Sequence, residues 1–504
     1  MPVPDASHYD LAIVGGGING AGIARDAAGR GLKVLLLEKD DLAAHTSSAS
    51  TKLIHGGLRY LEYYEFRLVA EALAEREVLL RAAPHIIVAL QFVLPHEPHL
   101  RPAWVIRTGL LLYDHIGGRR TLPSSFSVDL HASKWGAGLQ DKFRKGFVYS
   151  DARVDDARLV VLNALAAKEL GAQIRTRTRL VGARRERDLW RLTFVDAAGA
   201  VSEAQARGLV NAAGPWVKQV ADEVGARPTG AGVRHVKGSH IVVPRVHGEG
   251  HAYILQNADK RIVFVIPYQD EFSLIGTTDI AVQQFETAAI TPDEVAYLCG
   301  IVNAYLARPI GAGDVVWSYS GVRPLYDDGS VDPSAVTRDY VLKLDASVAG
   351  SAPLLSIFGG KITTYRRLAE AALSELKPFF PEMKGEWTRD EPLPGGDLPR
   401  GGLAAYEREL AARYPSLPAD LIGALIRRHG TRSPRILGQA KTVDELGKHF
   451  GASLYAAEID YLVAQEWATT AEDVLWRRTK CGLHLDAARR DAIAAYLRDH
   501  YGRP

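Results

Sequence analysis

Three glycines near the start of the chain have the spacing Gly15-x-Gly17-x-x-Gly20, which is typical of a loop that binds a pyrophosphate. In such a loop the first glycine allows a tight turn, the second lets the phosphates approach the backbone, and the third allows a helix to pack on a strand. Glu38 follows eighteen residues after Gly20, where a carboxylate can accept hydrogen bonds from a ribose. These residue types at this spacing predict dinucleotide binding.

The segments around these glycines supply the elements that such a site requires. Tyr9 to Val14 is an apolar run typical of a buried parallel strand, Ala21 to Arg30 has the composition of a helix, and Leu32 to Glu38 is a second apolar run. The sequence therefore predicts a β-α-β unit with the glycines at the helix N-terminus, whose positive end attracts an anion.

Small and hydroxylated residues follow from Thr46 to Thr51, and a Gly56-Gly57 turn comes shortly after them. Such residues can line the rest of an extended cofactor. A solvated Ser/Thr loop has the same composition, so composition alone leaves both interpretations open.

Composition narrows the class of protein. The chain has 504 residues, of which 47% are hydrophobic and 24% charged, and this mix excludes a disordered, fibrous or polytopic membrane protein. The net charge of +2 is too balanced for a general nucleic-acid binder. Two cysteines, Cys299 and Cys481, exclude a disulfide framework and favour a reducing compartment. We expect no secretory signal and no membrane-spanning helix.

Further elements are predicted along the chain. Helices are expected from Phe66 to Arg81, from Arg158 to Leu170, from about Thr363, and throughout the region after a Pro/Gly-rich linker at residues 392–401; the region from Pro84 to Lys145 is expected to be irregular. Short apolar runs predict strands at residues 173–180, 190–195, 208–213 and 354–358, and runs at residues 240–243, 261–266 and 272–275 predict a second, antiparallel sheet.

Ten strings of residues, spread over nearly the whole chain, closely resemble the FAD-dependent glycerol-3-phosphate dehydrogenases, respiratory enzymes that pass electrons to quinone. The strings are GGGINGAGIARDAAGRGL, TSSASTKLIHGGLRYLEYYEFRLVAEALAERE, VDDARLV, GLVNAAGPWV, KGSHIVVPR, IGTTD, YSGVRPL, TRDY, FGGKITTYR and LWRRTKCGL. The resemblance implies the fold of the D-amino-acid-oxidase-like flavoproteins, with an α/β, Rossmann-like FAD-binding domain, an α+β part in which an antiparallel sheet forms a substrate cap, and a C-terminal helical domain.

On this basis we assign residues 1–85, 146–232 and 320–385 to a discontinuous FAD-binding domain. Residues 86–145 and 233–319 are assigned to the substrate cap, with a segment that can face a membrane, and residues 400–504 to the C-terminal helical domain.

The resemblance also implies the reaction, which is oxidation of sn-glycerol 3-phosphate at C2 to dihydroxyacetone phosphate by hydride transfer to FAD. The substrate requires cations for its phosphate, and arginine forks suit phosphate oxygens. The residues expected to bind the substrate are Arg59, Tyr60, Thr278 and Arg338.

The expected catalytic residues are His240, Arg323 and Lys361. His240 is the first candidate for the base that accepts the hydroxyl proton, because a neutral imidazole has a suitable pKa, and Arg323 can stabilise the forming alkoxide. His55 is the alternative base, although its place beside Gly56 suggests contact with the flavin. Lys361, at a helix N-terminus capped by Thr363, would stabilise negative charge on the reduced ring.

The residues expected to contact FAD include those of the glycine loop, the hydroxylated loop and the Gly-Gly turns. They are Gly15, Gly17, Asn19, Gly20, Glu38, Lys39, Thr46, Ser47, Ser48, Lys52, His55, Gly57, Leu58, Val181, Ala213, Gly214, Trp216, Gly360, Lys361 and Thr363. His45, directly before this loop, is expected to be an exposed loop histidine, although a covalent bond to the flavin is conceivable. Neither C-x-x-C nor H-E-x-x-H occurs, so no metal is expected.

Trp104 to Tyr113 is apolar, and its flanks carry more arginines and lysines than aspartates. This pattern fits peripheral binding to an anionic membrane surface, and it also fits a buried helix of the cap. The quinone that the resemblance implies favours a cytoplasmic enzyme attached to the inner face of the cell membrane. A homodimer is expected.

Other functions remain open. A glycerol-3-phosphate oxidase would use oxygen as acceptor with the same catalytic strings, and an amine or amino-acid oxidase would need a carboxylate clamp instead of a phosphate site. A flavin-containing nucleic-acid-modifying or binding protein is disfavoured by the near-neutral charge. The C-terminal region from Gly401 to Pro504 carries no mechanism that we can derive, and we expect dimerisation or shielding.

Overall fold

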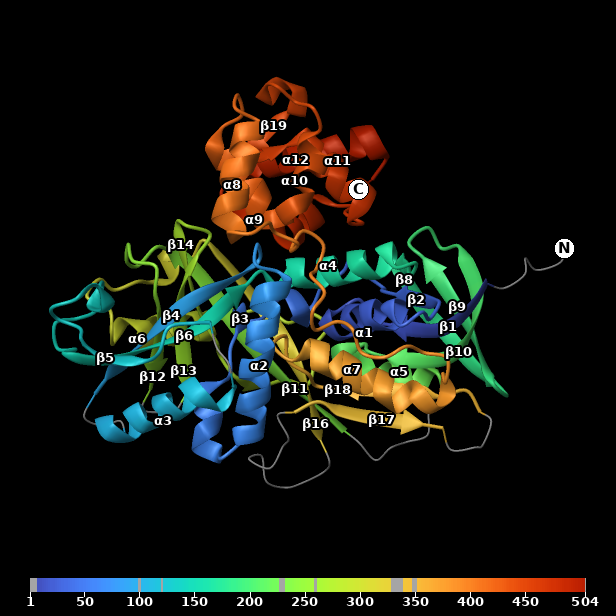
Figure 1. Ribbon diagram of the computed structural model, residues 1–504, viewed down its shortest axis with the longest axis horizontal. Helices are drawn as coiled ribbons and strands as arrows, with labels where there is room; N and C mark the ends of the chain where they lie inside the picture. The colour runs from blue at the N-terminus through green and yellow to red at the C-terminus, as the bar shows by residue number, and fades with distance from the viewer. Residues whose placement is uncertain are drawn as a thin grey trace.

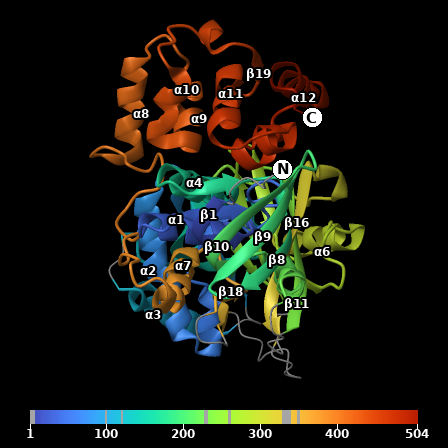
Figure 2. The same ribbon diagram turned by 90° about the vertical axis from the view of Figure 1, so that its right-hand side faces the viewer.

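The computed structural model describes residues 7–97, 101–118, 121–225, 232–257, 261–327, 339–346 and 351–503. Two large sheets lie side by side in the lower body of the molecule, and a helical domain formed by the C-terminal part of the chain lies above them (Figure 1). The view turned by 90° shows the same arrangement, with the C-terminal helices above the strands (Figure 2).

The first sheet has five neighbouring parallel strands in the order β18-β10-β1-β2-β7, with β17 antiparallel at one edge and the β8–β9 pair joined to β10. Its strands are β1 (Ser7–Val14), β2 (Val34–Leu37), β7 (Gln173–Arg175), β8 (Thr178–Glu186), β9 (Leu189–Asp196), β10 (Val201–Asn211), β17 (Val341–Asp345) and β18 (Leu354–Phe358). The predicted β-α-β unit is confirmed, because β1 and β2 pair in parallel on either side of α1 (Ile18–Gly29) in the chain.

Successive residues of β1 face opposite sides of this sheet, as the period of two requires. Leu11 and Ile13 pack into a core with α1, α4 (Asp156–Glu169) and α7 (Tyr365–Leu376). Ala12 and Val14 pack on the other side, where Trp190 of β9 and α5 (Val217–Glu223) complete a second core. The sheet is therefore covered on both faces, which explains why its strands are continuous apolar runs.

The second sheet has the order β15-β11-β14-β13-β12-β4-β6-β3, with β16 paired to β11 and β5 paired to β6, and it is antiparallel except between β12 and β4. Its strands are β3 (Leu53–Ile54), β4 (Ile87–His96), β5 (Phe126–Asp129), β6 (Lys145–Val154), β11 (Gly232–Pro244), β12 (Ala252–Gln256), β13 (Ile262–Tyr268), β14 (Phe272–Gly276), β15 (Ile280–Ala281) and β16 (Trp317–Asp327). The predicted antiparallel sheet is thus confirmed. Helices α2 (Phe66–Ala82), α3 (Ala103–Ile116) and α6 (Pro292–Asn303) accompany it.

Two expectations from the sequence need correction. The region from Pro84 to Lys145 is not irregular, because it contains β4, α3 and β5. Strands β3, β6 and most of β16 pair in the second sheet, although their residues were assigned to the FAD-binding domain. A buried apolar strand has the same pattern in either sheet, so its partner cannot be read from its own residues.

The C-terminal domain has its own hydrophobic core, which includes Leu425, Ile459 and Leu462. Its elements are α8 (Gly402–Arg413), α9 (Ala419–His429), α10 (Ser433–Leu437), α11 (Ala456–Gln465), α12 (Ala487–Tyr501), the hairpin of β19 (His449–Gly451) and β20 (Leu454–Tyr455), and the six-residue π-helix η9 (Asp473–Arg478). In the part of the chain that the structure describes, no helix has both the length and the apolar composition needed to span a bilayer.

The remaining helical segments are short 3-10 helices of three to six residues. They are η1 (Thr46–Ser48), η2 (Leu58–Tyr63), η3 (Lys134–Gly136), η4 (Gly214–Trp216), η5 (Ala312–Asp314), η6 (Lys377–Phe379), η7 (Gly430–Arg432), η8 (Val443–Leu446) and η10 (Cys481–Leu483). Three of them, η1, η2 and η4, carry side chains of the site described next.

Candidate functional site

A cavity of about 800 Å³ takes its walls from both sheets. The first sheet contributes the carboxyl ends of its parallel strands, with Val14 of β1, Leu37 of β2 and Ala212 after β10. The second sheet contributes side chains from β11, β13 and β16. Ligands of open parallel sheets bind at these carboxyl ends, so the cavity lies where the glycine pattern predicts a dinucleotide.

The glycine turn at this edge leaves no room for side chains at two positions. Gly15 has φ +112°, and a Cβ there would lie 2.4 Å from the Ala212 carbonyl oxygen. A Cβ on Gly20 would lie 1.9 Å from the Gly15 carbonyl oxygen, so Gly20 lets α1 pack closely and does not line the cavity. Gly17 lines the cavity, and its nearest neighbour for a Cβ is the Ser47 hydroxyl oxygen at 3.1 Å.

Glu38 closes the turn after β2 with both of its oxygens. One oxygen accepts the Gly16 amide at 2.6 Å and the other accepts the Asp40 amide at 2.7 Å. Burial raises the pKa of Glu38, and these two amide hydrogen bonds oppose the shift. A buried carboxylate at this place in the cavity suits the predicted ribose.

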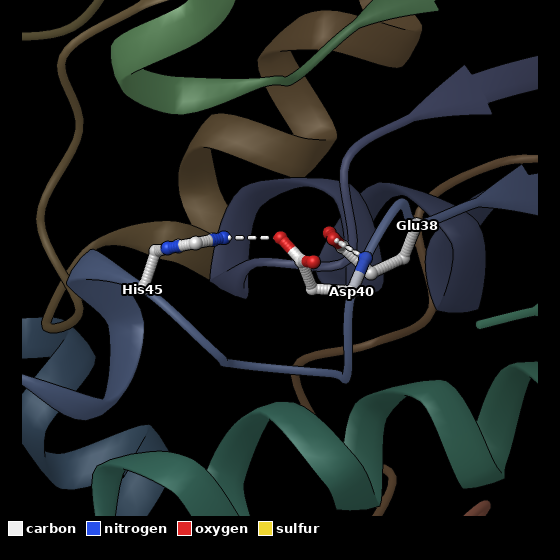
Figure 3. Close-up of side chains that lie close together, drawn as sticks. All are labelled: Glu38, Asp40 and His45. Carbon is white, nitrogen blue, oxygen red and sulfur yellow. Dashed lines mark hydrogen bonds and ion pairs between the residues drawn. The ribbon is translucent and has the colours of Figure 1, made fainter. Parts of the chain in front are cut away.

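Asp40 and His45 lie beside Glu38 (Figure 3). His45 Nε2 is 2.7 Å from Asp40 Oδ2, and this hydrogen bond holds the pKa of Asp40 below its usual range. Ligand atoms of the three residues lie within 4.8 Å of one another, a spacing that can suit a metal. The Glu38 oxygens already accept two amides, and the Lys39 ammonium pairs with Asp40, so the cluster is occupied by its own hydrogen bonds and ion pair.

Trp216 covers this end of the cavity. The Lys39 ammonium lies 4.4 Å from the centroid of its ring, and the His45 ring lies 4.5 Å away. His45 is about one-third exposed, and it lines the cavity together with Lys39, Ala213 and Trp216.

The hydroxylated loop is built into the cavity wall rather than solvated. Ser47 Oγ accepts the Ile18 amide at 3.0 Å, and Thr46 Oγ1 donates to the Val322 carbonyl at 2.7 Å. Asn19 donates to the Gly359 carbonyl at 3.1 Å, whereas its Oδ1 is buried with no hydrogen-bond partner among the described residues. That oxygen is an acceptor available to a bound ligand.

His240 lies at the part of the cavity formed by the second sheet. Its Nε2 is 3.0 Å from the Thr51 hydroxyl oxygen, and its Nδ1 is buried with no partner among the described residues. Burial, together with the charges of Lys52 and Arg323, lowers the pKa of His240 to about 3. The imidazole is therefore neutral at ordinary pH and can accept a proton.

Of the cations expected to bind the substrate or to act in catalysis, Arg59, Arg323 and Lys361 line the cavity. Arg323 pairs with Asp279 at 3.1 Å, and both side chains are exposed to solvent. Arg59 donates to the Tyr63 hydroxyl at 3.3 Å, and the Lys361 ammonium lies 4.3 Å from the centroid of the Tyr60 ring.

His55 also lines the cavity, together with Gly57, Leu58, Tyr60, Gly214 and Gly360. Burial lowers the pKa of His55, so this imidazole is also neutral. Thr363 lines the cavity but does not cap the helix as expected, because α7 begins at Tyr365 after Thr364. The Thr363 hydroxyl instead accepts the His55 amide at 3.3 Å.

Several expected contact residues lie outside the lining. Lys52 is buried in an ion pair with Asp156, with 2.7 Å between Nζ and Oδ1, and it also donates to the Ser48 carbonyl at 2.8 Å. The Thr278 hydroxyl accepts the Ser239 amide and donates to Glu294. These polar groups are satisfied within the protein, which explains why they do not reach the cavity.

The other differences from the expected lining depend on the direction in which each side chain points. Val181 is 41% exposed on β8, and the preceding residue, Leu180, lines the cavity in its place. Ser48 donates to the His45 carbonyl at 3.3 Å and is not part of the lining. Arg338 lies outside the described residues.

Three cavity residues of β11, namely Arg234, Val236 and Gly238, were not predicted from the sequence. Together with the predicted His240 they occur at every second position, and all four line the cavity. Ile262 and Phe264 of β13 show the same alternation. This spacing of two could have identified the row from the sequence, since one face of a strand presents every second residue.

Comparison with known proteins gives two family matches. A family described as FAD dependent oxidoreductase matches residues 10–366, and the C-terminal domain of alpha-glycerophosphate oxidase matches residues 387–502. The first match covers both sheets and the cavity, and the second covers the helical domain.

Individual proteins are similar over almost the whole chain. A glycerol-3-phosphate dehydrogenase of Pseudomonas aeruginosa is 54% identical over 503 residues, covering 99% of this chain and 97% of that protein. A D-erythritol 1-phosphate dehydrogenase of Brucella abortus is 53% identical and covers 97% of both. The X-ray structure of the glycerol-3-phosphate dehydrogenase from Bacillus halodurans complexed with FAD has a TM-score of 0.77 at 25% identity, covering 98% of this chain and 91% of that one.

Proposed function

The chain belongs to the family of FAD-dependent glycerol-3-phosphate dehydrogenases, and on this premise we propose that it oxidises sn-glycerol 3-phosphate at C2 to dihydroxyacetone phosphate. The observation that carries this proposal is that one cavity joins a dinucleotide cradle to a neutral histidine and three cations, Arg59, Arg323 and Lys361. When bound, FAD supplies the acceptor for the hydride that leaves C2.

The residues of the cradle fit FAD. Gly15 and Gly17 leave the backbone at the N-terminus of α1 open to a pyrophosphate, and Glu38 offers a carboxylate to a ribose. The orphan oxygen of Asn19 can accept a further hydrogen bond from the cofactor, since a buried acceptor without a partner is costly. Lys361 adds positive charge to the cavity, and burial together with this charge lowers the pKa of His55.

Residues of this chain carry out the remaining steps, which are binding of the phosphate and transfer of the proton. Arg59 and Arg323 hold the substrate phosphate, whose negative charge offsets the cations that depress the pKa of His240. In the tautomer that donates from Nε2 to Thr51, the Nδ1 of His240 keeps its lone pair. Nδ1 then accepts the proton of the C2 hydroxyl as the hydride departs.

The final electron acceptor in this proposal is a membrane quinone, and an exposed apolar surface supports it. Tyr64 is 80% exposed and Trp104 is 72% exposed, and the exposed apolar side chains nearby are Tyr63, Phe66, Leu111 and Leu112. Of the residues of α3, only Leu110 and Tyr113 are buried, so α3 is not the buried cap helix that the sequence allowed. Monomeric soluble proteins rarely expose such clusters unless they bind a partner or a membrane.

This surface adjoins the cavity through η2. Leu58, Arg59 and Tyr60 line the cavity, and Tyr63 at the end of the same turn belongs to the exposed surface. Arg101, before α3, is exposed and pairs with Glu62 at 3.6 Å, and its guanidinium suits anionic lipid. We therefore propose that the protein lies on the membrane by the surface of α3 and η2, with the cavity beside it.

The test uses the purified holoenzyme in detergent with lipid. Glycerol 3-phosphate and D-erythritol 1-phosphate are compared as substrates, each with a soluble quinone under argon and with oxygen alone. Fast quinone reduction with glycerol 3-phosphate and slow oxygen uptake are expected. Equal rates with oxygen would identify an oxidase, and faster turnover of D-erythritol 1-phosphate would overturn the substrate assignment.

A further inference from the structure

One short segment of the C-terminal domain, residues 476–480, contacts three residues that lie behind the cavity lining and are not part of it. Arg477 and Arg478 pair with Asp41, Lys480 pairs with Asp155, and Trp476 stacks on Trp317. The segment belongs to the string LWRRTKCGL, in the region for which only dimerisation or shielding was expected from the sequence.

The pair of Arg478 and Asp41 is buried and bidentate. Arg478 Nη1 donates to one carboxylate oxygen at 2.8 Å and Nη2 donates to the other at 2.7 Å. The same guanidinium donates to the Glu466 carbonyl within its own domain, at 3.1 Å from Nε and 2.7 Å from Nη2. Such a bidentate pair fixes the relative orientation of the two side chains in addition to pairing their charges. Neither side chain is more than 2% exposed.

Two consecutive arginines of a π-helical turn reach the same carboxylate. Arg477 Nε donates to Asp41 Oδ2 at 2.6 Å, beside the bonds from Arg478. Side chains next to each other in an α-helix point about 100° apart. The residues of η9, Asp473–Arg478, form a π-helix, and such turns occur frequently at functional sites.

Asp41 lies in the turn that carries Glu38. Ala44 donates its amide to the Asp41 carbonyl at 3.1 Å, and Ala43 donates to the Gly16 carbonyl at 3.1 Å. Gly16 in turn donates to Glu38. Holding Asp41 therefore holds the Glu38 carboxylate against the glycine turn at the ribose end of the cavity.

Two further contacts connect residues 476–480 to other parts of the protein around the cavity. Lys480 Nζ lies 3.1 Å from Asp155, whose neighbour Asp156 binds Lys52 and, through it, the Ser48 carbonyl of the hydroxylated loop. Trp476 stacks on Trp317 at 4.5 Å, Trp317 contacts Tyr319 at 5.1 Å, and Tyr319 stacks on His240 at 4.9 Å.

We propose that residues 476–480 of the C-terminal domain are positioning residues for FAD, with Arg478 the principal one. Through Asp41 they fix the Glu38 turn, and through Asp155 they fix the hydroxylated loop. The domain thereby supports the cofactor cavity of the same chain from behind its lining residues. This inference depends on FAD binding and not on which alcohol phosphate is oxidised.

The test measures release of FAD from the holoenzyme, followed by the flavin fluorescence that appears in solution. Arg478→Lys keeps the positive charge but cannot form the bidentate pair with Asp41. The control, Arg432→Lys, changes another buried arginine that lies between the domains. Arg432 binds Glu169 at the far end of α4, away from the cavity. We expect R478K to release FAD at least about tenfold faster than the wild type, the size of effect that losing an outer-shell partner has on a bound metal.

The control variant distinguishes positioning of FAD by Arg478 from a general effect of the contacts between the domains. R432K is expected to release FAD within about twofold of the wild type at the same temperature, as sites far apart act independently. Equal acceleration in both variants, or no acceleration in a folded R478K, would overturn the proposal. If R478K does not fold, Arg477→Gln is the milder variant, because Arg477 is partly exposed. We expect R477Q to show the same acceleration of FAD release and an altered visible circular dichroism of the bound flavin. The absence of these changes would count against the proposal.

Discussion

The imidazole of His240 lies nearly parallel to the ring of Tyr319, with 4.9 Å between centroids and 19° between planes. The Tyr319 hydroxyl donates to the Ser50 carbonyl at 2.8 Å, so the tyrosine is fixed to the loop that also carries Thr51. His240 is therefore held by a ring on one side and by a hydroxyl at Nε2, and its Nδ1 remains as the buried acceptor without a partner in the described structure.

Replacing His240 with asparagine removes the base, because an amide oxygen accepts a hydrogen bond but does not take up a proton at ordinary pH. We expect flavin reduction by glycerol 3-phosphate to slow by about 10²- to 10⁴-fold, the usual contribution of a general base, while the FAD content stays normal. Tyr319→Phe keeps the ring and serves as the control, with a much smaller effect expected. Stopped-flow absorbance measures both rates. A normal rate in H240N would move the role of base to His55.

Arg323 is exposed and paired only to the equally exposed Asp279 among the contacts described here. Arg323→Gln is expected to raise KM for glycerol 3-phosphate by about 10- to 100-fold, because a charged hydrogen bond contributes about 1.5–3 kcal/mol. The control is Arg184→Gln on β8, which pairs with Glu186 and does not line the cavity. Steady-state kinetics decide the matter, and an unchanged KM in R323Q would remove Arg323 from the phosphate site.

Gly20→Ala would place a methyl group 1.9 Å from the Gly15 carbonyl oxygen. Overpacking of this kind costs about 1–3 kcal/mol, and here the strain acts on the backbone of the cofactor loop. We expect a lower Tm and a reduced ratio of flavin to protein absorbance. Gly182→Ala is the matched control, because a Cβ there would meet no atom within 4 Å. Equal flavin content in the two variants would contradict the role given to Gly20.

His85 makes stability depend on pH. It is buried between the domains, neither ring nitrogen has a hydrogen-bond partner among the described residues, and burial lowers its pKa to about 3. The unfolded chain takes up this proton near pH 6.5 and the folded one only near pH 3, so stability falls as the pH drops through this window.

His85→Leu removes that titration. The slope of unfolding free energy against pH between these values should decrease by up to about 1.4 kcal/mol per pH unit. Denaturant unfolding at several pH values measures it, with the slope and not the absolute stability as the readout. An unchanged slope would show that His85 is protonated in the folded protein.

Trp104 tests the membrane surface. Trp104→Ser removes an exposed aromatic side chain from α3, and we expect about tenfold weaker partitioning to anionic vesicles, since burying a large apolar side chain contributes about 1.5–3 kcal/mol. Val181→Ser on β8 removes an exposed apolar side chain elsewhere and should leave partitioning unchanged. Flotation of the holoenzyme gives both values, and equal binding of the two variants would exclude this surface.

The sequence predicted that the glycine turn and Glu38 lie together at one edge of a site, as they do in the cavity, because these requirements are local. Gly15, Gly17 and Glu38 are close in the chain, and the strand and helix between them have clear periods. The resemblance to a family added residues from distant strings, such as His240 and Lys361, which the fold brings to the same cavity.

Other features depend on tertiary packing and were not predictable. Lys52 lies in a family string, yet its ammonium is buried against Asp156, more than one hundred residues away. The pairing of Arg478 with Asp41 joins residues from opposite ends of the chain, and no local pattern of either segment marks it.

The central claim is that this cavity oxidises glycerol 3-phosphate with bound FAD. The most direct measurement is the visible spectrum of the purified holoenzyme under argon, recorded before and after addition of glycerol 3-phosphate. The account predicts loss of the oxidised flavin band within one turnover and its return when a quinone is added. A flavin spectrum that does not change with saturating glycerol 3-phosphate would contradict the account.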